Sequence, residues 1–392
     1  MNAIGDDPDI VKFVYWDNLT YAPPGSRIPE EWDAGLGARL YASYLDHCVE
    51  AERLGYAGVS MPEHFGPSSP CPHPNIILAA LAARTTTTRI LSGANLPLLH
   101  HPMELAEQLA MVDVLSGGRL EVGLGRIGDR AAQEHAIDLV DGGLNTVDLP
   151  VRRADLTTSS ATFLPDVEAA KVTVWPRPVQ KRVPLWAAAG SDESFATAAR
   201  RGLGTFTGLN INPSAGGLTT VGVEEMVPRL QRYIEIGREH GHHLSMAHVM
   251  ASCFTVVADT DREAADIVRS GFISHVEAAA GHLARMAGAA PGESPLDSPE
   301  AQERMGIKAV REAPDDFFVK NPFALVGSAE TVREKLDALL SAGLTRFLLL
   351  CGGVGTAHDI AWQSATAMAE DVAPELFAAT RPGPGRVAVQ QT

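Results

Sequence analysis

Short apolar runs alternate with amphipathic segments along almost the whole chain, and this alternation predicts a parallel α/β fold. Eight runs have the length and composition of buried strands: residues 11–16, 57–61, 89–95, 119–124, 183–188, 204–207, 246–257 and 345–351. Helical patterns separate most of them, at residues 38–54, 74–84, 103–115, 193–201, 224–240, 261–281, 330–342 and 357–376. Eight strand–helix units predict a (β/α)8 TIM barrel, and 392 residues leave room for insertions. A doubly wound sheet fits less well, because no GxGxxG turn follows the first strand.

The strand–helix rhythm predicts one barrel domain over residues 1–380, with two interruptions. Residues 127–170 show no convincing alternation, although a barrel needs a crossover there. Residues 287–322 are rich in Pro, Gly, Ser and Glu, which indicates a long insertion or lid beside the last barrel unit. The tail 381–392 contains Pro-Gly-Pro-Gly, and we expect it to be disordered.

The tract 96–128 is the most informative part of the sequence. Pro102 stands where the first turn of a helix tolerates proline. Leu105, Leu109 and Val112 then repeat at i, i+4 and i+7, which gives one buried helix face. Glycines end the helix, and an apolar strand follows that leads into Arg126. A strand, helix, strand unit with a basic exit is typical of an anion site in an α/β enzyme.

Composition excludes several function classes. The chain has 48 acidic and 32 basic residues, a net charge of −16, which argues against nucleic-acid binding. The longest apolar runs, such as 76–83, are too short to span a bilayer, and the first residues lack the features of a signal peptide. The four cysteines are scattered without a CxxC pair, as in reduced proteins. We therefore expect a cytoplasmic protein without membrane or nucleic-acid partners.

Glu63 and His64 directly follow the strand 57–61, where barrel enzymes place catalytic groups. A histidine there could move protons near neutral pH, with Glu63 holding its orientation. The alternative is a loop histidine that bonds only to backbone.

Gly190, Ser191 and Ser194 follow the strand 183–188 and open a helix. Hydroxyls three residues apart in a first turn, beside free N–H groups, can hold a phosphate. The alternative is an ordinary N-cap in which Asp192 and Glu193 complement the helix dipole, and the residues alone favour this cap.

The glycine run 352–355 follows the last predicted strand, near the place where many barrels bind phosphate. A single short glycine run is also typical of a close turn into the next helix, and both interpretations stay open.

The sequence contains two groups of neighbouring histidines. His240, His242 and His243 indicate a solvated helix end rather than a metal site, because tetrahedral ligation needs an organised fourth group. His100 and His101 are interpreted as structural residues of the turn before the helix. No metal site is predicted.

Several segments resemble, in the correct order, the luciferase-like monooxygenases, the flavin-dependent family that includes bacterial luciferase. The segments that carry the resemblance are 19–24, 54–65, 96–126, 176–204 and 327–343. The resemblance implies a TIM barrel whose mouth binds reduced FMN, which reacts with O2 to give a 4a-peroxyflavin that oxygenates a small organic substrate. It also implies a separate flavin reductase and a homodimer. Two alternatives are an oxidoreductase of the same fold that uses the deazaflavin F420, and a non-catalytic flavin-binding homologue.

The resemblance also assigns residues to roles. It implies that His64 donates or accepts a proton near the flavin, and that Arg126, Ser191 and Ser194 hold the flavin phosphate. The flavin ring is expected against the strand end at Gly93, Ala94 and Asn95, where several family members have a non-proline cis peptide.

The sequence departs from the family pattern at three places. Gly125 stands where bacterial luciferase has a cysteine, and Phe65 replaces a second histidine. The segment after Arg126 is short and is expected to lack the helix, and its phosphate-binding arginine, that precedes the run at 176–180. Arg152 and Arg153 are the substitutes that the sequence offers.

Overall fold

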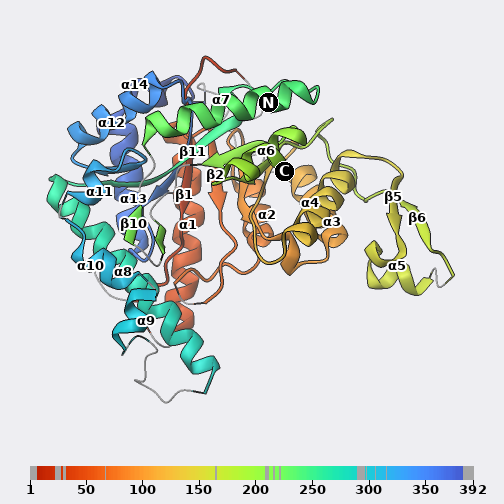
Figure 1. Ribbon diagram of the computed structural model, residues 1–392, viewed down its shortest axis with the longest axis horizontal. Helices are drawn as coiled ribbons and strands as arrows, with labels where there is room; N and C mark the ends of the chain where they lie inside the picture. The colour runs from red at the N-terminus through yellow and green to blue at the C-terminus, as the bar shows by residue number, and fades with distance from the viewer. Residues whose placement is uncertain are drawn as a thin grey trace.

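Eight parallel strands close into a barrel in the computed structural model of the chain (Figure 1). The strands are β1 (Lys12–Asp17), β2 (Gly58–Met61), β3 (Arg89–Asn95), β4 (Leu120–Leu124), β7 (Leu185–Ala188), β8 (Gly204–Thr207), β11 (Val249–Val257) and β13 (Arg346–Cys351). Each pairs in parallel with its neighbours in that order, and β13 returns to β1. These are the eight runs predicted from the sequence, so the TIM-barrel prediction is confirmed. The structure describes residues 7–22, 28–29, 32–66, 68–163, 166–207, 212–214, 217–219, 222–288, 296, 298–304, 306–314 and 316–382.

A short parallel strand, β12 (Ala324–Gly327), was not predicted. It pairs with residues 254–257 of β11, while β8 pairs with residues 249–251 of the same strand. β11 is long enough to take two partners in succession along one edge. Two small antiparallel pairs complete the strands: β5 (Leu149–Arg152) with β6 (Ala169–Val172), and β9 (Asn212–Ser214) with β10 (Gly217–Thr219).

The longer helices surround the barrel and mostly match their predicted ranges. They are α1 (Ala34–Leu54), α2 (Pro74–Arg84), α3 (Pro102–Leu115), α4 (Arg130–Asn145), α6 (Asp192–Arg200), α7 (Val223–Glu239), α8 (Asp261–Met286), α12 (Ala329–Ser341) and α13 (His358–Ala367). The single helix predicted over 357–376 is divided. A π-helical turn at Met368–Val372 follows α13, and Pro374 begins the separate α14 (Pro374–Ala378). Pro374 has no N–H to continue the hydrogen bonds of the preceding turn and fits the first position of a new helix, which agrees with the division.

The segment after β4 corrects one expectation. It contains α4, a 16-residue helix, where no helix was expected. Gln133, Ile137, Val140 and Leu144 give the helix a buried face, but a glycine pair obscures the pattern in the sequence. Gly143 is there because α3 packs closely: a Cβ on this residue would lie 2.8 Å from the Cβ of Ala106.

Beyond α4, the β5–β6 hairpin and the short α5 (Thr158–Phe163) project from the barrel (Figure 1). Arg152 lies in this hairpin and pairs with Asp155, 3.0 Å away. The hairpin therefore carries both arginines that the sequence offered as substitutes for a phosphate ligand. Neither Arg152 nor Arg153 lines the cavity described below.

The predicted insertion 287–322 contains three short helices, α9 (Pro299–Arg304), α10 (Ile307–Glu312) and α11 (Phe317–Lys320), and α10 and α11 pack against α8. Residues 289–295, 297, 305 and 315 lie outside the described residues, as does most of the predicted tail, from 383 onward. No helix in the described part of the chain is long and apolar enough to cross a membrane.

The core has two parts, because alternate strand residues face opposite ways. Outward-facing residues such as Phe13 and Ile90 pack under the helices, and inward-facing residues such as Trp16 and Phe254 fill the barrel. Inside the barrel, the Glu121 carboxylate accepts hydrogen bonds from Arg89 Nε at 2.9 Å and from Trp186 Nε1 at 2.7 Å. These three side chains, from β3, β4 and β7, fill the barrel interior where they meet.

Candidate active site

His64 stands at the barrel mouth, which we define as the C-terminal ends of the strands with the loops that follow them. Its backbone N–H donates to the carbonyl of Cys71 at 3.0 Å, which fixes the loop after β2. Its ring Nδ1 is buried and has no hydrogen-bond partner among the described residues. Burial and the neighbouring His275 lower the pKa of His64 to about 4. The imidazole is therefore uncharged at neutral pH and has a free ring nitrogen.

Glu63 does not orient His64, contrary to the prediction. Its fully buried carboxylate accepts hydrogen bonds from the backbone N–H of Leu96 at 2.9 Å and contacts His100 Nε2 at 2.8 Å. The Glu63 backbone N–H donates to the carbonyl of Ala94 at 3.2 Å. The reason is tertiary: the loop after β2 lies against the end of β3, so the nearest partners of Glu63 belong to β3 and not to its sequence neighbour. Glu63 and His100 thus hold the end of β3 in place.

The end of β3 has the features expected of it. The peptide bond between Gly93 and Ala94 is cis, as the resemblance implied. A Cβ on Gly93 would overlap the hydroxyl of Ser60 on β2, so glycine allows the two strands to approach here without moving that hydroxyl. Asn95 is fully buried, and its amide Nδ2 lies 3.5 Å from Glu63 Oε2.

Buried polar atoms that have no hydrogen-bond partner among the described residues gather around this strand end. They come from the ends of β1, β2 and β3, the loops that follow them, and α8. They are Trp16 Nε1, Asn18 Oδ1, Thr20 Oγ1, Ser60 Oγ, His64 Nδ1, Asn95 Oδ1 and His275 Nδ1. A buried polar group without a partner is costly, so such a group at a barrel mouth indicates the place of a polar ligand.

A second feature lies between α4 and α6, next to the mouth. A cavity of about 320 Å³ is lined by Arg126 from the end of β4 and by Ser194 from the first turn of α6. Arg130 and Arg201 also line the cavity, together with Glu134. The lining therefore holds three guanidinium groups and one carboxylate. Arg126 and Ser194, which the sequence analysis assigned to phosphate binding, line the same cavity although 68 positions separate them in the chain.

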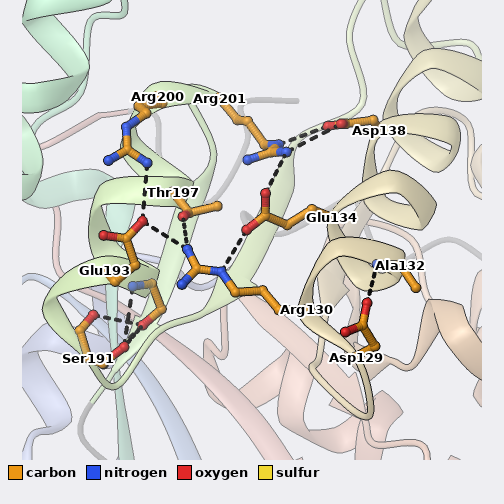
Figure 2. Close-up of polar contacts among 11 residues, drawn as sticks. Asp129, Arg130, Ala132, Glu134, Asp138, Ser191, Glu193, Thr197, Arg200 and Arg201 are labelled. Carbon is orange, nitrogen blue, oxygen red and sulfur yellow. Dashed lines mark hydrogen bonds and ion pairs between the residues drawn. The ribbon is translucent and has the colours of Figure 1, made fainter.

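Ion pairs hold α4 and α6 together around this cavity (Figure 2). Arg130 at the start of α4 donates to Glu134 at 2.9 Å and to Glu193 of α6 at 2.8 Å. Arg201 pairs with Asp138 at 2.8 Å and with Glu134 at 3.4 Å. In contrast, no described residue forms a hydrogen bond or ion pair with Arg126, whose side chain is exposed. The Arg126 guanidinium is thus free to bind an anion, while the other two are already held by carboxylates.

Ser191 and Ser194 form the N-cap that the sequence left as the alternative. Ser191 is the N-cap of α6, and its hydroxyl accepts from the Ser194 N–H at 3.3 Å. The Ser194 hydroxyl in turn accepts from the N–H groups of Ser191 at 2.9 Å and Gly190 at 3.1 Å. Neither carboxylate of this turn lines the cavity itself: Asp192 pairs with Arg229 at 3.2 Å, and Glu193 pairs at 2.8 Å with Arg130, which does line it. The cap is confirmed, and the added role of these hydroxyls in phosphate binding stays a prediction.

The glycine run after β13 forms a close turn. Gly352, Gly353 and Gly355 all have φ between +73° and +78°, and a side chain on Gly355 would overlap the backbone of α8 at Gly271. A left-handed turn pressed against a helix requires glycine, so the close turn is confirmed, and phosphate binding at this run stays a prediction.

The histidine cluster 240–243 lies at a helix end, as expected. His240 follows the last residue of α7, and its Nδ1 contacts the carbonyl of Ile236 at 2.9 Å. His242 Nε2 contacts the carbonyl of Arg200 at 3.0 Å.

Sequence reasoning missed four residues of these two features. Arg130 and Arg201 were missed because α4 itself was not recognised, and His100 because it seemed part of a turn. His275 lies inside a long helix, where a single histidine gives no signal. Only the fold brings His275 against the loop after β13 and close enough to His64 to lower its pKa.

Comparison with known proteins identifies the family. The model of the luciferase-like monooxygenase family matches residues 26–346, so the chain belongs to this family. Among curated relatives, the oxygenase component of a flavin-dependent trigonelline monooxygenase from Acinetobacter baylyi is 25% identical over 236 residues. That match covers 58% of this chain and 62% of the relative. Another relative matches over only 28% of its length, so the chain spans less than two thirds of these proteins.

Solved structures agree on the fold. The oxygenating constituent of 3,6-diketocamphane monooxygenase from Pseudomonas putida, solved in complex with FMN, has a TM-score of 0.62 and 20% identity. The alignment covers 93% of this chain and 99% of that one. A coenzyme F420-dependent tetrahydromethanopterin reductase from Methanopyrus kandleri has a TM-score of 0.59 and 16% identity, with 94% and 99% covered.

Proposed function

We propose that this protein is a flavin-dependent monooxygenase that uses reduced FMN, supplied by a separate reductase, and O2 to oxygenate a small organic substrate. Membership in the luciferase-like family supports the reaction class. The relative described as an oxygenase component supports a separate reductase, and the FMN complex of the diketocamphane enzyme supports the cofactor.

The observation that carries the proposal is the cavity between α4 and α6. FMN ends in a phosphate dianion, which binds best to a guanidinium together with hydroxyls and helix N–H groups. Arg126 from the end of β4 and Ser194 from the first turn of α6 both line this cavity. The residues present therefore fit the phosphate end of the cofactor.

The barrel mouth fits the other end. The isoalloxazine ring has carbonyl and N–H groups, and unpartnered polar atoms of Ser60 and Asn95 lie beside the cis peptide where the ring is expected. Bound there, reduced flavin supplies the electrons that activate O2. His64 is uncharged at neutral pH and can take a proton from, or return one to, a reacting atom. Glu63 and His100 keep the end of β3 fixed while this happens.

The test is an anaerobic titration of the protein with reduced FMN, followed by oxygen. We expect saturable binding of reduced FMN, and oxygen consumption that depends on an added NADH-dependent flavin reductase and rises with a true substrate. Absence of reduced-FMN binding would refute the proposal.

An F420-dependent oxidoreductase is the second candidate, because the methanogen reductase has nearly the same structural similarity to this chain. Titration with reduced F420 in parallel decides between them, since the cofactor that belongs to the protein binds more tightly. The third possibility, a non-catalytic homologue, rested on a missing helix after β4, and α4 removes that reason. A homodimer stays a prediction that light scattering can check.

A further inference from the structure

α8 lies against the barrel mouth and presents one face to it. Ala264, Ala265 and Val268 of this helix belong to the same buried apolar cluster as Trp16 and Phe254. In Figure 1, α8 lies at the same end of the molecule as α9 and α10. α8 is therefore a wall of the site region and not only an outer helix of the barrel.

Two histidines occupy the face of α8 that meets the loops. His275 and His282 are seven residues apart, two helical turns, and so share this face. A Cβ on Gly355 would lie 2.8 Å from the Cβ of His275, and one on Gly66 would lie 3.3 Å from the ring of His282. Gly66 is two residues from His64. α8 thus runs from the loop after β13 to the loop that carries His64.

His275 has the same unusual state as His64. Each ring has a buried Nδ1 with no partner among the described residues. Burial lowers the pKa of His275, as it does that of His64, and the proximity of His275 lowers the latter further. Two uncharged imidazoles near each other, both with an unused nitrogen, are costly unless a ligand bonds to them.

The charged groups around this pair are engaged elsewhere. Glu63 is bonded to His100 at 2.8 Å, and Glu277 of α8 pairs with Arg311 at 3.2 Å. Arg269 of α8 donates to the carbonyl of Ala313 at 3.1 Å. The arginines that line the cavity between α4 and α6 lie on the side of the barrel formed by β4 and β7. Among the causes that shift the pKa of His64 and of His275 there is no carboxylate, lysine or arginine, so we infer that a ligand group at the two histidines would meet hydrogen-bonding groups and not a fixed charge of the described residues.

We propose that His275 is a second imidazole of the active site, and that it and His64 together bind the oxygen of an uncharged carbonyl or hydroxyl group of the substrate. The assignment rests on the proposed monooxygenase function and narrows its substrate class to ketones, alcohols and phenols. A carboxylate or sulfonate group would be buried there without a cation, which is strongly unfavourable.

The experiment uses histidine-selective NMR of the FMN-bound protein, with acetone and acetate as probes. The two probes have nearly the same size and shape and differ in charge. We expect acetone to shift the ring signals of both His64 and His275, and to bind about tenfold or more tightly than acetate, because burying an unpaired charge is costly. Signals that respond to neither probe, or that respond equally or more strongly to acetate, would overturn the inference.

Variants give a second, independent measurement. In His275→Gln we expect the pKa of His64 to rise from about 4 but to stay below its usual value, because burial is the larger cause and remains, and we expect the acetone response of His64 to weaken. His282→Gln is the matched control on the same helix face and should leave both unchanged. An unaltered pKa of His64 in His275→Gln contradicts the pairing. If His275→Gln folds poorly, His275→Asn is measured in its place. Loss of FMN binding by the unmodified protein would instead refute the proposed function, and so the two failures are distinguishable.

Discussion

Replacing Arg126 by alanine tests the cofactor assignment most directly, since its guanidinium lines the α4–α6 cavity with no described partner. Alanine leaves no buried charge uncompensated, so the variant should fold normally. A charge-assisted hydrogen bond to phosphate contributes about 1.5–3 kcal/mol. We therefore expect FMN to bind about 10- to 150-fold more weakly to Arg126→Ala. Riboflavin, which lacks the phosphate, should lose at most about twofold.

The assay is a fluorescence titration of each protein with FMN and with riboflavin, which forms a cycle of two proteins and two ligands. Arg229→Ala is the control for general electrostatics. Arg229 pairs with Asp192 in the first turn of α6, yet does not line the cavity. Because Arg126 is exposed, its contribution should also fall as salt screens the charge. Equal losses for FMN and riboflavin, or an equal effect of Arg229→Ala, would refute the role given to Arg126.

Three further predictions concern stability. Glu121→Gln should lower the free energy of unfolding by about 3–5 kcal/mol in urea titrations, because Arg89 keeps its buried charge; an effect no larger than that of the exposed Glu330→Gln would contradict this. Ser191→Ala should cost about 1 kcal/mol through loss of the α6 N-cap, and Ser191→Asn should restore most of it. Burial is the largest single cause and lowers the pKa of His358, but the Asp17 carboxylate, the Ser43 backbone and Asp359 together raise it more, so the net pKa lies above its usual value. The stabilisation by this ion pair is then complete below a pH of about 6.5 and is lost as the pH rises through the pKa of His358 in the folded protein. The Tm of the unmodified protein should therefore exceed that of His358→Gln at low pH, and the difference should shrink as the pH rises. A difference in Tm that does not change with pH would count against the ion pair.

The strand pattern was the strongest information in the sequence. All eight predicted runs became barrel strands, because a strand buried on both faces must be apolar along its whole length. The exit of β4 and the first turn of α6 were also recognisable, since Arg126 and Ser191 follow strands directly and local order is enough to place them. What the sequence could not separate was the N-cap from the phosphate ligand, as one serine can serve as both.

The helix α4 was hidden for a reason that lies outside its own segment. Its glycine pair has low helix propensity, and only the close packing of α3 against Gly143 explains why glycine stands there. Because α4 was not predicted, Arg130 and Arg201 were not recognised as residues of the cavity, although their ion pairs join α4 to α6.

The sequence by itself determined the eight barrel strands and their order, most of the helices between them, and the residues that follow those strands. The partners of these residues came only from the tertiary structure, which turned Glu63 away from His64 toward His100 and brought His275 to His64 from more than two hundred residues away. The physical reason is that hydrophobic periodicity records which side of an element is buried, whereas a hydrogen bond depends on which distant element arrives on that side.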